Sequence, residues 1–211
     1  MKNAMSKEVS DQLTERVMYY FREVSNIPRG SGNEAAIADY LEKFADSIRK
    51  KTDVKRIEKV IGQKNVHDII ISVPGTKGYE DYETVILQAH IDMVCQKSPE
   101  SNHDFLKDPI DYAEKDGIIK ANGTTLGADD GIGVASILAI LENDEISHPP
   151  LEALFTSDEE QDMTGAMAVT REYIKGKRLI NIDTEEEGTF YYGCAGGVNA
   201  NFDLPAKYID T

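Results

Sequence analysis

The feature that most constrains this fold is a series of short apolar runs that alternate with helical segments. Runs of this length, rich in Val, Ile and Leu, are typical of strands, and helices placed between them favour parallel pairing. The expected strands cover residues 66–73, 84–89, 117–121, 151–156 and 178–182, and the expected helices between them cover 131–142 and 164–173. The pattern therefore predicts an α/β fold in which a mixed, partly parallel sheet is flanked by helices.

Two further helices are expected before the first of these strands. Residues 9–24 place apolar side chains at helical spacing, which predicts an amphipathic helix. A second such segment extends to about Arg49 and begins with Ser31-Gly-Asn-Glu34. This spacing matches a capping box, in which the serine hydroxyl and the glutamate carboxylate bond to free backbone N–H groups at the helix start. We therefore predict that Ser31 and Glu34 cap the second helix.

The charge balance excludes several classes of partner. The chain has 23 Lys and Arg against 38 Asp and Glu, a formal net charge of −15, so nucleic acid and anionic membranes would be repelled. Residues 1–11 lack the apolar core of a signal peptide, and the apolar run 132–141 is about half the length that crosses a bilayer. Two cysteines, Cys95 and Cys194, make no disulfide framework and are expected to be small buried residues. We expect a cytoplasmic protein.

Four segments place histidine or carboxylates near predicted strand ends or at a helix start. In the extended segment that contains His90 and Asp92, the two side chains point to the same side. Asp129 opens a helix after small and apolar residues, which predicts that it lies inside the protein. Asp183 ends the last apolar strand. Each of these segments alone also fits an ordinary role, as a surface pair, a helix start or a strand end.

The fourth segment carries Glu159 and Glu160 directly after an apolar strand. Because neighbouring side chains project in different directions, one of them can bind a cation while the other transfers a proton, although a charge run is also typical of solvated surface. Taken together, one imidazole and several carboxylates suit zinc, manganese or cobalt. His67, His103 and His148 have no ligand-like spacing, and the sequence contains no Gly-x-Ser-x-Gly, phosphate-binding or His-Glu-x-x-His motif.

Several stretches resemble one peptidase family in order along the chain. The segments 27–34, 87–97, 103–110, 124–133 and 193–197 are similar to those of aminoacyl-histidine dipeptidases, also called Xaa-His dipeptidases or peptidase D. Members of this family are metallopeptidases with two zinc ions at the active site. The resemblance implies that His90 and Asp183 are terminal ligands of one zinc, that Asp129 bridges both ions, and that Glu160 binds the second.

The same resemblance implies the remaining roles at the site. Asp92 is expected to orient His90, and Glu159 to act as the general base. The peptide bond between Asp129 and Asp130 is expected to be cis. The substrate would be a short peptide with a free amino terminus, in particular an Xaa-His dipeptide.

Family members are longer than this chain, and that difference sets the expected domains. Residues 1–187 would be the amino-terminal part of the catalytic domain, and 188–211 would begin a lid and dimerisation domain whose first strand covers 198–204. We expect the longer protein to be a homodimer through that lid, and the chain alone to be inactive. A related aminotripeptidase, carboxypeptidase or N-acyl-amino-acid deacylase would also fit these motifs, and so would a non-catalytic metal-binding module.

Overall fold

The structure is a computed structural model that describes residues 6–48, 51–184, 186, 188–193, 196 and 205. The strand expected over 198–204 lies outside these residues, as do Cys194 and much of the proposed lid segment. Within the described part of the chain, no helix combines the length and apolar character needed to cross a membrane.

The main sheet has five strands and mixed directions, which confirms the predicted fold class. The strands are, in sheet order, β1 (Asp53–Ile61), β2 (Lys64–Val73), β6 (Leu151–Thr156), β3 (Val85–His90) and β7 (Arg178–Asn181). Pairing is antiparallel from β1 to β6 and parallel from β6 through β3 to β7. The two parallel pairs bring the carboxyl ends of three strands to one edge of the sheet.

Two strands were not predicted from the sequence. The edge strand β1 was missed, and so was β4 (Tyr112–Lys115). The strand expected over 117–121 is β5 (Ile118–Ala121), but it pairs with β4 in a separate two-stranded sheet and does not join the main one.

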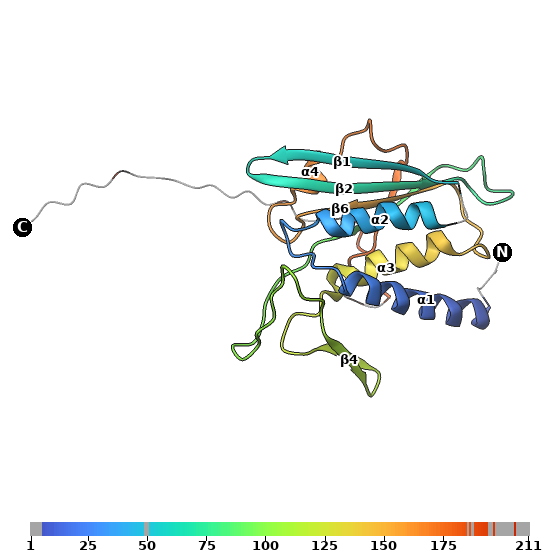
Figure 1. Ribbon diagram of the computed structural model, residues 1–211. Coiled ribbons are helices and arrows are strands. Elements are labelled where there is room, and N and C mark those ends of the chain that lie inside the picture. The colour runs from blue at the N-terminus through green and yellow to red at the C-terminus, as the bar shows by residue number, and fades with distance from the viewer. Residues whose placement is uncertain are drawn as a thin grey trace, which may run out of the picture.

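Helices cover both faces of the main sheet (Figure 1). One face carries α1 (Lys7–Ser25), α2 (Ala35–Ser47) and α3 (Ala128–Glu142), and the other carries the short α4 (Thr164–Ala168). The helix predicted over 164–173 is therefore much shorter than expected. α3 packs between β3 and α1, which explains why it is apolar on all sides rather than on one stripe.

The core follows the two-residue period of the strands. On β2, Ile69 and Ile71 pack under the three long helices, whereas Ile70 faces α4. β3 and β6 end in register, with His90 opposite Thr156. The polar residues that follow these strands, and those that follow β7, are thereby held at the same edge of a buried sheet, where open α/β sheets bind ligands.

Candidate metal centre

Three predicted ligands from distant parts of the chain meet at this edge. His90 ends β3, Asp129 lies at the start of α3, and Asp183 follows β7. His90 Nε2 lies 2.8 Å from Asp129 Oδ1 and 3.9 Å from Asp183 Oδ1. One donor atom from each residue lies within 4.8 Å of the other two, and the histidine is buried. The structure thus forms a compact group of one imidazole and two carboxylates.

The start of α3 is irregular, and its two aspartates differ in burial. Asp129 and Asp130 have non-helical backbone angles, and the peptide bond between them is cis, as the resemblance implied. The prediction that Asp129 lies inside is wrong, because 54% of its side chain is exposed. The buried residue is Asp130, which accepts bonds from the backbone N–H groups of His90 (3.1 Å) and Gly133 (3.2 Å). A Cβ at Gly133 would lie 2.1 Å from Asp130 Oδ1, so this turn needs glycine.

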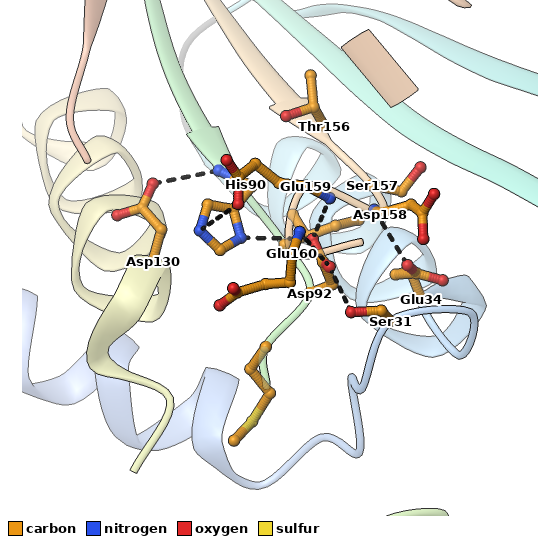
Figure 2. A network of polar contacts seen from close by, with 12 residues as sticks. Ser31, Glu34, His90, Asp92, Asp130, Thr156, Ser157, Asp158, Glu159 and Glu160 are labelled. Carbon is orange, nitrogen blue, oxygen red and sulfur yellow. Dashed lines mark hydrogen bonds and ion pairs between the residues drawn. The ribbon is translucent and has the colours of Figure 1, made fainter. Parts of the chain in front are cut away.

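Asp92 is the centre of the polar network drawn in Figure 2. It is fully buried, and its Oδ1 lies 3.3 Å from His90 Nδ1. It accepts bonds from Ser31 Oγ (2.7 Å) and from the backbone N–H groups of Glu159 (3.0 Å) and Glu160 (3.3 Å). Burial would raise the pKa of Asp92, but the bonds from His90 and Ser31 outweigh it and lower the pKa. Asp92 therefore contacts the histidine ring and accepts the backbone N–H groups of both glutamates.

Glu159 and Glu160 line different cavities beside the group. Glu159 Oε2 lies 3.8 Å from His90 Nε2, and the residue borders a cavity of about 380 Å³ together with Asp183. Glu160 borders another cavity, of about 360 Å³, together with Ser31. Burial, and next the nearby Asp129 carboxylate, raises the pKa of Glu160.

The predicted capping box is wrong. α2 begins after Glu34, and no side chain caps it. Ser31 Oγ bonds to Asp92 instead, and Glu34 Oε1 accepts the backbone N–H groups of Gly32 (2.9 Å) and Asp158 (3.2 Å). Burial raises the pKa of Glu34 to about 7. The motif was visible in the sequence, but its side chains hold the loops around the site rather than the helix.

The electrostatics of the site favour a cation. Burial would lower the pKa of His90, but its bonds to Asp92 and Asp129 raise it to about 9. Burial, followed by the Asp129 carboxylate, raises the pKa of Asp183 to about 6. Burial, followed by Asp183, raises the pKa of Asp130 to about 8. A positive ion would relieve this crowding, and an imidazole nitrogen with carboxylate oxygens suits zinc, manganese or cobalt. The residues present therefore fit a divalent metal.

The other residues considered from the sequence lie apart from this group. Cys95 is half-buried rather than fully buried, and burial raises the pKa of its thiol. His67 lies 3.6 Å from Glu58, and the ring of His103 packs against Phe105. His148 is buried, with Nδ1 2.7 Å from a backbone carbonyl oxygen.

Comparison with known proteins finds peptidases. The family described as Peptidase family M20/M25/M40 matches residues 86–201. The cytosol non-specific dipeptidase of Escherichia coli is 41% identical over 197 residues, which is 93% of this chain and 39% of that protein.

Two crystal structures with related sequences share the fold. The aminoacylhistidine dipeptidase from Vibrio alginolyticus has a TM-score of 0.75 and 40% identity, covering 86% of this chain and 35% of its own. An aminopeptidase from Bacillus cereus has a TM-score of 0.66 and 27% identity, covering 82% of this chain and 44% of its own. The chain thus spans less than half the length of each of these relatives.

Proposed function

The chain belongs to the M20/M25/M40 peptidase family, and from this premise we propose that it carries part of a two-zinc site that hydrolyses short peptides. The observation that carries the proposal is the meeting of His90, Asp129 and Asp183 within 4.8 Å. The relatives in Escherichia coli and Vibrio alginolyticus are named dipeptidases, which supports a dipeptide substrate. The second name, aminoacylhistidine dipeptidase, supports Xaa-His dipeptides in particular.

The proposed ligand roles divide four residues between two metal ions. His90 and Asp183 would hold one ion, Asp129 would bridge to the second, and Glu160 would bind the second. Support for Asp129 as the bridge is that its carboxylate lies 2.8 Å from His90 Nε2, is 54% exposed and, next to burial, raises the pKa of the nearby Glu160 carboxyl. Bound divalent ions would supply Lewis-acid polarisation of the scissile carbonyl and would lower the pKa of a water molecule.

Glu159 is the proposed general base. Its carboxylate lies beside His90, and its backbone is held by Asp92. From this position it would take a proton from the attacking water and deliver it to the leaving amine nitrogen, a role worth about 10²–10⁴-fold in rate. Asp92 is fully buried and would act through His90 rather than on the substrate: its Oδ1 lies 3.3 Å from Nδ1, while Nε2 faces Asp129.

The longer assembly is also a proposal. We place residues 1–187 in the catalytic domain and 188–211 at the start of a lid through which a homodimer forms. The chain alone would then be inactive, and the protein would be cytoplasmic. An aminotripeptidase is the second candidate; the Bacillus cereus relative is named an aminopeptidase, which supports removal of an amino-terminal residue but fixes no peptide length. The same ligand group would also suit a carboxypeptidase or an N-acyl-amino-acid deacylase, whereas a non-catalytic module would bind metal without turnover.

Zinc content and peptide hydrolysis together test the proposal. After dialysis against Zn²⁺, elemental analysis should show less bound zinc in His90→Ala than in the wild-type chain. Glu159→Gln should retain its zinc, and so should Glu145→Gln, a control on the exposed loop at the far end of α3. Equal zinc in His90→Ala and the wild type would contradict the ligand assignment.

Hydrolysis is measured as histidine released from β-alanyl-histidine by the longest native form of the protein. Glu159→Gln should lower kcat by about 10²–10⁴-fold at equal zinc content, whereas Glu145→Gln should leave it unchanged. A zinc-loaded protein that cleaves neither dipeptides nor tripeptides would support the non-catalytic module instead. Faster cleavage of tripeptides than of Xaa-His dipeptides would favour the aminotripeptidase.

A further inference from the structure

A buried arginine lies behind the proposed metal centre. Arg29 follows α1 in the loop that leads to α2, and only 2% of its surface is exposed. Its guanidinium donates to backbone carbonyl oxygens: Nη1 bonds to Ile91 (3.1 Å) and Asp92 (2.7 Å), and Nη2 bonds to Gly127. Among the residues that the structure describes, no carboxylate forms a salt bridge with it, although Asp92 and Asp130 lie near enough to attract its charge.

These three carbonyl groups belong to two segments that carry proposed ligands. Ile91 and Asp92 directly follow His90, and Gly127 lies two residues before Asp129. The two segments are far apart in the sequence and come from a strand end and a helix start. One planar side chain therefore connects the backbone on both sides of the contact between His90 Nε2 and Asp129 Oδ1.

The neighbouring sequence makes room for this side chain. A Cβ at Gly127 would lie 2.7 Å from Arg29 Nη2, and a Cβ at Gly131 would lie 2.5 Å from the same atom. Glycine at both positions thus gives the guanidinium a fitted space against the start of α3. Burial lowers the pKa of Arg29 to about 10, while Asp92 and Asp130 oppose that shift, so the group stays charged at neutral pH.

We propose that Arg29 is a positioning residue for the metal centre, because it joins the backbone of the His90–Asp92 segment to that of the Asp129 segment. The inference rests on the proposed function, since it assumes that these residues bind metal. Arg29 touches neither the donor atoms nor the two cavities beside them. It sets the spacing of His90 and Asp129 before an ion arrives, so the ligands need little rearrangement on binding.

The geometry requires arginine rather than any cation. A guanidinium presents several N–H groups in a fixed plane and can bond to two segments at once. A lysine at this position would keep the positive charge but concentrate its donors at one point. Arg29→Lys therefore keeps the positive charge but removes the bonds that join the two segments, so it tests the effect of those bonds alone.

Cobalt binding by the purified chain tests this inference. Co²⁺ serves as the probe because its visible absorption reports ligand geometry as well as affinity. Arg29→Lys should bind Co²⁺ about 10–100-fold more weakly than the wild type, with a changed visible spectrum and an unchanged far-UV circular dichroism spectrum. Arg16→Lys is the matched control, since Arg16 also joins two elements, through Glu142 at the end of α3, but contacts no ligand segment.

A second variant covers the case in which Arg29→Lys does not fold. Gly131→Ala places its new methyl group against the guanidinium, while alanine itself favours a helix. It should also weaken Co²⁺ binding and change the spectrum. Wild-type affinity and spectrum in both folded variants, or an equal loss in Arg16→Lys, would overturn the inference and leave the proposed function intact. A wild-type chain that binds no Co²⁺ would overturn both.

Discussion

Replacing Asp92 by asparagine is the sharpest single test of how the site is built. The two carboxylate oxygens of Asp92 face four groups: Oδ1 faces His90 Nδ1 and the N–H of Glu159, and Oδ2 faces Ser31 Oγ and the N–H of Glu160. The residue is fully buried, so water cannot replace a lost partner. Asparagine has nearly the same shape but offers only one acceptor oxygen.

The expected cost follows from the two orientations of the new amide. If the amide oxygen takes the Oδ1 position, the amide nitrogen faces Ser31 Oγ and the N–H of Glu160. The serine hydroxyl can rotate to accept a bond from the amide. The backbone N–H of Glu160 then has no acceptor. If the amide is reversed, His90 and the N–H of Glu159 both face a donor. The first orientation is therefore preferred, and one unmet buried donor costs about 1–3 kcal/mol of unfolding free energy.

Metal binding should weaken as well. A neutral amide cannot favour the histidine tautomer as a carboxylate does, and changes of this kind lower metal affinity by about 10–100-fold. Urea unfolding of the metal-free chain measures the first effect, and a Zn²⁺ titration measures the second. Asp39→Asn is the control, since Asp39 is an exposed residue of α2 that accepts a bond from Arg56 of β1. Zinc affinity within about threefold of the wild type, together with unchanged unfolding, would refute the central role of Asp92.

Two further predictions concern the support of the loop after β6. Burial raises the pKa of Asp68 from 3.8 to about 6. The folded chain therefore loses no stability from Asp68 below pH 4, where the group is protonated in both states. The loss in unfolding free energy grows between pH 4 and 6 and reaches about 3 kcal/mol above pH 6. Asp68→Asn should remove this loss, and parallel urea-unfolding curves against pH for variant and wild type would contradict it. Gly165→Ala places a Cβ 2.4 Å from the carbonyl oxygen of Ser157 and should destabilise the chain by about 1–3 kcal/mol in the same assay, whereas wild-type stability would show that the backbone yields freely.

The meeting of the proposed ligands could be predicted because it follows from strand direction. Apolar runs that end in polar residues mark strand ends, and parallel strands end at one edge. That reasoning places His90 and Asp183 together without any knowledge of side-chain packing. The burial of Asp130 in place of Asp129 could not be predicted in this way. It depends on the irregular backbone at the start of α3, and the sequence pattern of a helix start carries no sign of it.

The missed strand β1 has a different physical cause. It is an edge strand that carries Lys, Arg and Glu side chains, and only Ile57 on it is fully buried. Charged edge strands are common because they prevent association with other sheets, but the charges remove the apolar alternation that reveals a strand. β1 forms because all nine of its residues pair with β2, and that pairing is a property of the partner strand.

The capping motif shows how a local pattern can be overruled by contacts from distant elements. The loop that carries the two glutamates leaves β6 with backbone N–H groups that have no strand partner. Buried carboxylates from three separate parts of the chain accept these N–H groups in succession. Asp68 accepts the N–H of Ser157, and Glu34 accepts that of Asp158. Asp92 accepts the N–H groups of Glu159 and Glu160. Burying such groups costs free energy unless every donor is well placed. The chain thus accepts a polar, costly interior at this edge because the carboxylates hold the glutamate backbones in position without occupying the site.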